Sequence, residues 1–466
     1  MITPEAVKFD AYLQQGEKKI SIEAKHASKY SLLIRFLNGY NPSQESEFER
    51  IVFHIKDEKI EFGPCRYIVA SKKNGYQGHL VFSKTVYDLN SLFLKNRIES
   101  LQTEFSNLPL IFSQKKAINT QFKDYTANLT FDLNVYKDKF DKLDSRFYHE
   151  PEQIRQNVQG AIIETEGREF MNYLDDKLEE FEYIVSDFTK KEHKRHGFYF
   201  RKQLWNLILC SPFMTRTNIR PRGYSGDSDM MNMIYANEYE GSTTFGKLMH
   251  KHPVEHPAAQ AVRNRIGTIT KYLNELKSKK PKESHKKIHV LSVACGPALE
   301  LQNVLKSTED CSTFKFSLLD QDKIALSEAE TVVTELENRF GAKIEVDYLN
   351  DSVRSMLTTP DLDKLWGKFD FIYSMGLFDY LTPPVAKGVL KALYKILENR
   401  GALVVGNFHI SNPSRYYMEY WLDWILYYRT EQNFLDLLKS VTTVDPSVLF
   451  EETGSQMFLH VKSDKH

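Results

Sequence analysis

The sequence lacks the long apolar runs and the cysteine clusters that mark membrane proteins and disulfide-rich secreted proteins. No run of about 18 apolar residues occurs, so we expect no membrane span. The first residues, Met1–Glu5, do not combine a basic segment with an apolar core, so we expect no signal peptide. The 4 cysteines are scattered without a Cys-x-x-Cys pair. This pattern favours free thiols in a cytoplasmic protein and predicts no metal site.

An excess of charge of one sign is also missing. Lysine plus arginine number 62 and aspartate plus glutamate number 62, which gives a formal net charge of zero. We therefore expect no nucleic-acid partner, because such partners select strongly basic surfaces. The basic stretch Lys190–Arg195 is explained more simply as the C-terminal end of a helix. The 466 residues suffice for two or three domains, which we predict at 1–110, 111–280 and 281–466.

The first 110 residues contain short apolar or alternating segments separated by turn residues, which predicts a small β-barrel or sandwich. The predicted strands are Ser21–Ala24, Ser31–Phe36, Arg50–Ile55, Lys59–Phe62, Arg66–Ala70 and His79–Phe82. In pattern and placement this region resembles a PilZ-like domain, a small β-barrel that often binds cyclic di-GMP. The RxxxR and [D/N]xSxxG motifs of the binding members are absent. The degenerate pattern favours a structural or docking role over binding of cyclic di-GMP.

Residues 111–280 have a helical pattern that is broken by one unusual loop. Leu174, Leu178, Phe181 and Val185 recur at the spacing of one helix face. The segment Arg220–Asp227 (R-P-R-G-Y-S-G-D) then places glycines and functional side chains together in a loop. Such loops often carry function, although an Arg–Asp pair in a structural turn would also explain it.

The stretch Ile288–Glu300 reads as a buried strand, a tight glycine turn and the start of a helix over Ala298–Leu305. Strands and helices alternate from there, which predicts an α/β fold with a Rossmann-like, mostly parallel sheet. The last two segments form a hairpin, so the final strand is antiparallel. The predicted strands are Ile288–Val293, Phe314–Leu319, Lys343–Val346, Phe369–Ser374, Ala402–Phe408, Ser447–Glu452 and Gln456–Val461, with helices over Ile324–Phe340 and Pro384–Glu398.

Small and polar residues follow these strands where a nucleotide would bind. A mostly parallel sheet that ends in an antiparallel hairpin resembles the sheet of class I S-adenosylmethionine (SAM)-dependent methyltransferases. A nicotinamide oxidoreductase would instead end in a parallel strand. The turn is a degenerate motif I, with Ala298 at a frequent glycine position and Ser292 at a frequent acidic one. The resemblance implies SAM as cofactor, bound by Ala294, Cys295, Gly296, Asp320, Gln321, Asn350, Asp351, Ser374 and Met375.

Three further motifs resemble a narrower group, the bacterial methyltransferases that make 3-hydroxy fatty acid methyl esters (the extracellular factor). These motifs are Arg222–Asp227 with Met230–Asn232, Asn407–His409 with Ser411–Tyr417, and Asp423–Trp424 with Tyr428–Thr430. Some relatives carry PilZ-like N-terminal domains. The resemblance implies a small-molecule or acyl acceptor, with a fatty-acid-type carboxylate as one candidate. Two alternatives stay open: a methyltransferase for an oxygen or nitrogen of another metabolite, and a cyclic-di-GMP-responsive protein whose methyltransferase-like domain is inert. Oligomeric state is not predicted.

The chemical nature of the methyl acceptor decides whether the site needs a general base. A carboxylate acceptor already has its lone pairs free, whereas a hydroxyl or amine needs a base. The candidate catalytic residues are His409, Asp227 and Tyr224, although His409 could instead bond the loop that follows it. The candidates for holding the acceptor are Arg222, Tyr224, Asn412, Arg415, Tyr416 and Tyr417. The aromatic stretch Tyr416–Tyr428 could equally pack into a core or line an apolar channel.

Overall fold

The computed structural model describes residues 10–463 apart from residues 28–30, 38–39, 41–44, 56–57, 72–76, 83–107, 282–284, 440 and 443–444. The chain divides into two compact units, Met1–Ala117 and Ile118–His466. The predicted domain 1–110 lies in the first unit. The helical region from residue 118 and the α/β region share the second unit.

The first unit contains an eight-stranded antiparallel sheet with the strand order β4-β7-β8-β3-β2-β1-β5-β6. Alternate residues of the strands point into one core, as Leu32, Ile34 and Phe36 do in β3. The six predicted segments lie within strands, but β1 and β4 were missed because their sequences are largely polar. The strands are β1 (Asp10–Gln15), β2 (Lys18–Ala27), β3 (Ser31–Phe36), β4 (Glu45–Phe48), β5 (Arg50–Ile55), β6 (Glu58–Phe62), β7 (Cys65–Ser71) and β8 (Gln77–Phe82). A further helix, α2 (Leu108–Lys115), ends this unit.

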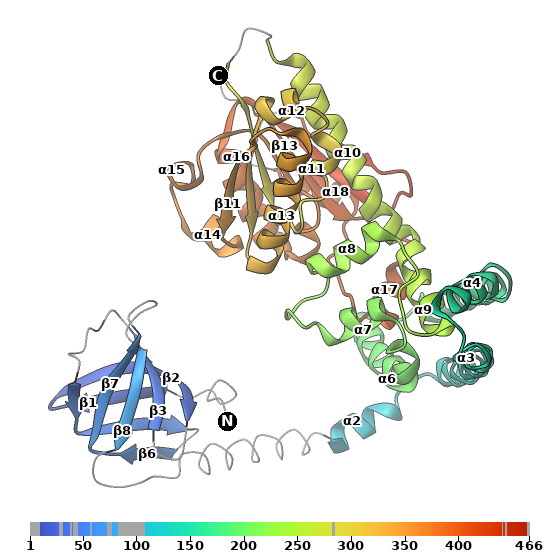
Figure 1. Ribbon diagram of the computed structural model, residues 1–466, viewed down its shortest axis with the longest axis horizontal. Coiled ribbons are helices and arrows are strands. Elements are labelled where there is room, and N and C mark those ends of the chain that lie inside the picture. Colours follow the sequence, from blue (N-terminus) through green and yellow to red (C-terminus); the bar gives the residue numbers. More distant parts are fainter. Residues whose placement is uncertain are drawn as a thin grey trace. The chain divides into compact units, whose positions relative to one another are not determined.

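Helices form the first part of the second unit (Figure 1). In α5 the buried residues Phe170, Leu174, Phe181 and Val185 lie on one face, as the spacing predicts. The expectation for Lys190–Arg195 is wrong, because Thr189 and Glu192 form a capping box that makes this stretch the start of α6. The helices are α3 (Thr120–Arg146), α4 (Glu152–Ile162), α5 (Arg168–Val185), α6 (Lys190–Ile208), α7 (Pro212–Ile219), α8 (Ser228–Ala236), α9 (Thr244–Glu255) and α10 (Pro257–Lys279), with a π-helical turn at Ile163–Gly167.

The second part is a seven-stranded sheet with the order β11-β10-β9-β12-β13-β15-β14. Strands β9 to β13 are parallel, and the C-terminal hairpin makes β15 antiparallel to both of its neighbours. The direction of winding reverses between β9 and β12, so the fold is Rossmann-like. The strands are β9 (Ile288–Val293), β10 (Phe314–Asp320), β11 (Glu345–Asn350), β12 (Phe369–Ser374), β13 (Leu397–Phe408), β14 (Ser447–Phe450) and β15 (Gln456–Lys462).

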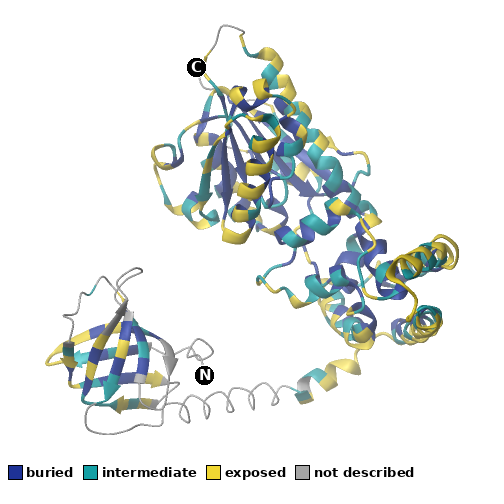
Figure 2. Cartoon of the chain, in the orientation of Figure 1, coloured by how far each residue is buried: buried dark blue, intermediate teal, exposed yellow. Residues whose placement is uncertain are grey.

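Two apolar cores cover the two faces of this sheet, and the burial of the strands is visible in Figure 2. On one face α10 and α13 contribute Ile269, Leu273 and Val333. On the other face α16 contributes Val389 and Leu393. The helices of this part are α11 (Leu301–Val304), α12 (Thr308–Thr313), α13 (Lys323–Phe340), α14 (Val353–Thr358), α15 (Leu362–Trp366), α16 (Pro383–Lys395), α17 (Arg415–Trp421) and α18 (Glu431–Asp436), with a 3-10 turn, η3, at Phe378–Tyr380.

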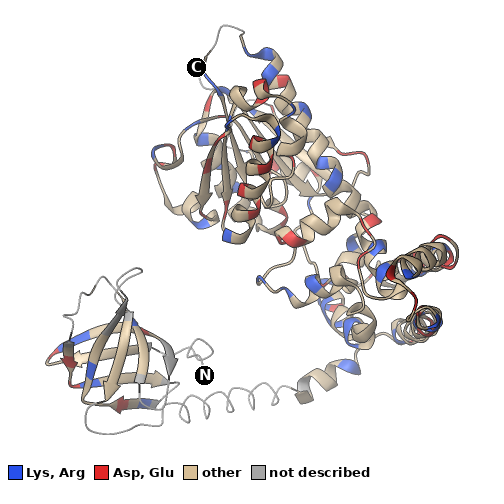
Figure 3. Cartoon of the chain, viewed as in Figure 1, with Lys and Arg blue, Asp and Glu red and all other residues tan. Residues whose placement is uncertain are grey.

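Basic and acidic residues are interspersed along the helices of the second unit (Figure 3). This distribution agrees with the balanced charge of the sequence. Each helix that the structure describes is too short or too polar to cross a lipid bilayer.

Candidate active site

The turn after β9 has an unusual backbone. Ala294, Gly296 and Ala298 all have left-handed φ angles, of 55°, 56° and 53°. The expected helix over Ala298–Leu305 is wrong, because the turn continues to Glu300 and α11 covers only Leu301–Val304. An alanine adopts a left-handed φ at an energetic cost that glycine avoids. The alanine at the degenerate motif position therefore has the backbone conformation that a glycine would supply.

Asp320, the last residue of β10, fixes this turn from the neighbouring strand. Its Oδ2 accepts a hydrogen bond from Gly296 N at 3.0 Å, and its Oδ1 accepts one from Asp322 N at 2.9 Å. Because the residue is buried, its pKa is raised despite these hydrogen bonds. A buried carboxylate at the edge of the sheet can accept further hydrogen bonds from two vicinal hydroxyl groups.

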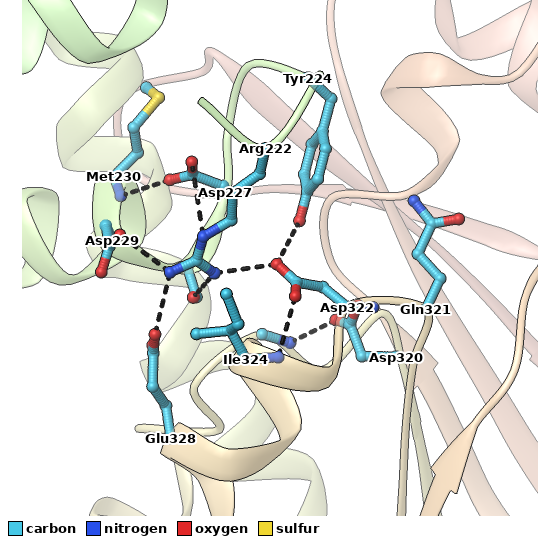
Figure 4. A network of polar contacts seen from close by, with 12 residues as sticks. Arg222, Tyr224, Asp227, Asp229, Met230, Asp320, Gln321, Asp322, Ile324 and Glu328 are labelled. Atoms are coloured by element: carbon cyan, nitrogen blue, oxygen red, sulfur yellow. Dashed lines mark hydrogen bonds and ion pairs between the residues drawn. The ribbon is translucent and has the colours of Figure 1, made fainter. Parts of the chain in front are cut away.

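The loop 220–227 is tied to the start of α13 by Arg222 (Figure 4). The Arg222 guanidinium lies 2.9 Å from Asp322 Oδ2, 2.8 Å from Asp229 Oδ2 and 3.2 Å from Glu328 Oε1. Asp322 also caps α13 by accepting from Ile324 N at 2.9 Å. Burial raises the pKa of Asp322, but the hydrogen bonds from Ile324 and Arg222 outweigh it and the pKa is lowered. Arg222 was predicted to hold the acceptor, but its guanidinium nitrogens form ion pairs with three acidic side chains of the protein.

The contacts of Asp227 stabilise the start of α8 and the loop before it. It caps α8 by accepting from Met230 N at 3.0 Å, and Arg216 Nε lies 2.8 Å from its Oδ1. Only 1% of the residue is exposed. Tyr224, which lies between Arg222 and Asp227 in the sequence, points towards Asp322 and donates to its Oδ2 at 3.3 Å (Figure 4).

A cavity of about 280 Å³ opens at the carboxyl ends of β9, β10 and β12. This is the place where the winding of the sheet reverses, and ligands of open α/β sheets bind there. Of the predicted residues, those that line the cavity are Tyr224, Ala294, Cys295, Gly296, Asp320, Gln321, Asp351 and Met375. The structure therefore brings most of the predicted cofactor residues together with Tyr224 and Gly226 of the loop 220–227.

Two predicted cofactor residues support the cavity from outside its lining. Ser374 is fully buried and donates to Val293 O at 2.9 Å, which joins β12 to β9. Asn350 Nδ2 donates to the carbonyl oxygens of Asp320 and Gln321, both at 3.1 Å.

The structure places the predicted acceptor residues after β13 elsewhere. His409 Nδ1 lies 2.6 Å from Ser411 Oγ, and Asn412 accepts from Ser414 N. Arg415 pairs with Glu419 at 3.0 Å. Tyr416 stacks on His193, and the Tyr417 hydroxyl lies 2.8 Å from His252 Nδ1. None of these five residues is part of the cavity lining among the described residues.

The aromatic stretch serves both purposes considered from the sequence. Tyr417, Tyr420 and Trp421 are buried in the core of the helical region. Trp424 and Leu426 line the cavity, together with Phe408 and Val262. The Trp424 Nε1 donates to the Tyr380 hydroxyl at 2.8 Å, and this hydroxyl donates to Ser225 O at 2.8 Å. The side of the cavity that Phe408, Trp424 and Leu426 line is therefore largely apolar and contacts the loop 220–227.

Three charged residues that line the cavity were not predicted from the sequence: Arg265 of α10, Glu300 before α11 and Asp379 of η3. Burial raises the pKa of Glu300, which accepts from the Tyr373 hydroxyl at 2.7 Å. Arg265 donates to the Tyr235 hydroxyl at 3.4 Å and to Met231 Sδ at 3.1 Å. No acidic oxygen of the described residues lies within 4.0 Å of Arg265. The cavity therefore offers a cation and an acid that form no ion pair within 4.0 Å of each other among the described residues.

Comparison with known proteins gives one family match. A sequence family described as "Putative methyltransferase" matches residues 179–377, from α5 to the residues after β12. This range contains the loop 220–227, the turn 294–298 and Asp320. No curated protein sequence matches the chain.

Several solved structures are similar to part of the chain. A possible exported protein from Bordetella parapertussis has 15% identity and a TM-score of 0.40, with 51% of this chain and 80% of that chain covered. Magnesium protoporphyrin IX methyltransferase from Synechocystis PCC 6803, with bound S-adenosylhomocysteine (SAH), has 10% identity and a TM-score of 0.33, with 44% and 85% covered. The N-methyltransferase NodS from Bradyrhizobium japonicum WM9, in complex with SAH, has 14% identity and a TM-score of 0.30, with 44% and 88% covered.

Proposed function

We propose that the protein is a SAM-dependent methyltransferase that acts on a small-molecule acceptor. The observation that carries the proposal is the cavity at the reversal point of the sheet, bordered by the left-handed turn 294–298 and by Asp320. The antiparallel hairpin at the end of the sheet supports it, since class I methyltransferases end in this way. The family match over residues 179–377 supports it independently.

The charges of the cavity fit the groups of SAM. Asp320 would accept from the ribose hydroxyls, and Gln321 and Asp351 would lie beside the adenine. Glu300 and Arg265 carry opposite charges without forming an ion pair with each other, and so they suit the ammonium and carboxylate of an amino acid. When bound, SAM supplies an activated methyl group on a positively charged sulfur. The chain then has to orient the acceptor and to exclude water.

The first candidate for the acceptor is a fatty-acid-type carboxylate, as the resemblance to the methyl ester enzymes suggests. The apolar lining by Val262, Phe408, Trp424 and Leu426 supports an acceptor with an apolar part. Tyr224 would contact it from the loop 220–227. The role of His409 as a general base stays a prediction, although its position outside the lining gives it no direct support.

The second candidate is an oxygen or nitrogen of another small metabolite. One observation favours it, because the buried Asp379 lines the same cavity and could take up a proton. For the first unit we propose a PilZ-like domain with a structural or docking role. The alternative is a protein that responds to cyclic di-GMP through the first unit and has a catalytically inert second unit.

The test is transfer of a labelled methyl group from SAM to small molecules of a bacterial extract by the full-length protein. We expect label in a small organic product and formation of SAH. The matched control is Asp320→Ala, which should abolish both. Formation of neither product by wild-type protein that binds SAM would contradict a catalytic function and would favour the inert alternative.

A further inference from the structure

Asp379 is a buried acid that two other segments of the chain hold in place. It lies in η3, five residues after the end of β12, and only 2% of it is exposed. Its Oδ1 accepts from Phe408 N at 2.7 Å, and its carbonyl oxygen accepts from Tyr427 N at 2.7 Å. The carboxylate is therefore fixed at the end of β13, on the apolar side of the cavity that Phe408, Trp424 and Leu426 also line.

This carboxylate has no cation as partner. Within the described residues no Lys, Arg or His nitrogen lies within 4.0 Å of it. Arg429, the buried cation nearby, donates instead to the carbonyl oxygens of Phe378 at 2.7 Å and Leu381 at 2.6 Å. Buried carboxylates are ordinarily paired, because desolvation of an unpaired charge is costly. An unpaired one that lines a cavity is available to a ligand.

We propose that Asp379 is the proton acceptor of the reaction, and that of the two acceptor candidates it is the second, a hydroxyl or amine group, that is methylated rather than a carboxylate. The inference rests on the proposed function. The O–H or N–H bond of the acceptor breaks and its proton goes to Asp379. The electron pair that remains forms the bond to the methyl carbon. The bond between that carbon and sulfur breaks with its electrons left on sulfur, which becomes an uncharged thioether.

The charged and titratable groups around Asp379 agree with this role. Burial raises the pKa of Asp379 to about 7, while the hydrogen bond from Phe408 and the charges of Arg265 and Arg429 oppose the rise. Tyr380 and Tyr428 also face it, and burial raises the pKa of both phenols. A base with a pKa near the working pH is suited to proton transfer. An acceptor carboxylate at this place would be repelled by the ionised form.

The first test is a calorimetric titration of the full-length protein with SAM and with SAH at several pH values. SAM carries a positive sulfur and SAH does not, so an ionised acid beside the reacting centre favours SAM. We expect the ratio of the SAM and SAH affinities to rise as pH rises through about 7, on the order of tenfold. Asp379→Asn should lose this rise and still bind SAH. Asp138→Asn, an exposed change on α3, should keep it.

The outcomes separate this inference from the proposed function. A wild-type ratio that does not change with pH overturns the role of Asp379, and this comparison stands even where Asp379→Asn does not fold. Failure of the folded wild-type protein to bind either ligand overturns the proposed function itself.

The second test concerns the acceptor group. Wild-type protein is incubated with methyl-labelled SAM and a bacterial extract, and the labelled products are treated with mild alkali. A methyl ether or methylamine keeps its label, which is the expected result. A methyl ester releases the label as methanol, and an ester as the main product overturns the inference. Asp379→Asn should form the stable product at least about a hundredfold more slowly.

Discussion

The Arg222 guanidinium lies 2.9 Å from the Asp322 carboxylate, and this ion pair joins two segments that are 100 residues apart in the sequence. One segment is the loop 220–227, which carries Tyr224. The other is the N-terminus of α13, directly after Asp320. The pair holds Tyr224 beside the carboxylate that we assign to the ribose. The ion pair therefore positions Tyr224 in the cavity wall, whereas Arg222 and Asp322 are outside the lining of the described residues.

Arg222→Gln should weaken SAH binding and the fold together. The change leaves Asp322, Asp229 and Glu328 without their shared cation, at a cost of roughly 3 kcal/mol. We expect a lower free energy of unfolding in urea and a higher dissociation constant for SAH. Arg339→Gln, an exposed change on α13, the helix that carries Glu328, is the control and should alter neither. An unchanged SAH affinity in Arg222→Gln would show that the loop does not shape the site.

Ala298→Val should destabilise the turn after β9. Ala298 is fully buried with a φ of 53°, and a β-branched side chain is poorly tolerated in both respects. We expect a loss of roughly 2–3 kcal/mol in the free energy of unfolding. Ala298→Gly is the matched control, and its stability should stay within about 1 kcal/mol of wild type. A tolerated valine would mean that the left-handed conformation is absent in solution.

Asp379→Asn should stabilise the protein at alkaline pH. The folded-state pKa of Asp379 is raised to about 7 from the ordinary value of 3.8. The folded state therefore binds the proton more tightly, and wild-type stability falls as pH rises from about 4 to about 7. Above that range the free energy of unfolding of the variant should exceed that of wild type by roughly a few kcal/mol. Below about pH 4 the two should converge. Urea unfolding at both ends of the range measures this, and a variant that is less stable at pH 8 contradicts it.

The full-length protein should not bind cyclic di-GMP. The first unit lacks the arginine motif that would stack on guanine and pair with phosphate. Titration with cyclic di-GMP should give no heat and leave the SAH affinity unchanged. Saturable binding, or a shift of the SAH affinity, would support the regulatory alternative.

The strands of the sheet were predictable because each is a short apolar run next to a turn. Ile288–Val293 and Phe369–Ser374 have the predicted bounds in the structure. Strand β11 is shifted to Glu345–Asn350, since this edge strand is polar and only half-buried. The position of Asp320 at the carboxyl end of β10 was predictable as well, because this residue closes a buried apolar run.

The charged residues of the cavity were not predictable from the sequence. Arg265 lies in an amphipathic helix among other polar residues, and only the packing of α10 on the sheet turns it towards the cavity. Asp379 lies five residues beyond β12 and looks like a turn residue. Conversely, Arg222 resembles a ligand residue in the sequence, but residues about 100 positions later, Asp322 and Glu328, engage it. Such long-range pairings are set by the fold and not by local pattern.

The most direct test of the account is calorimetric titration of the full-length protein with SAH, for wild type and Asp320→Ala. We expect one site per chain for the wild type. We expect a loss of affinity of at least about a hundredfold for the variant, because two hydrogen bonds to a charged group are removed. Asp363→Asn, a change on α15 outside the cavity lining of the described residues, should bind like wild type. Folded wild-type protein that gives no heat with SAH, or an Asp320→Ala variant that binds as wild type does, would contradict the assignment of the cavity.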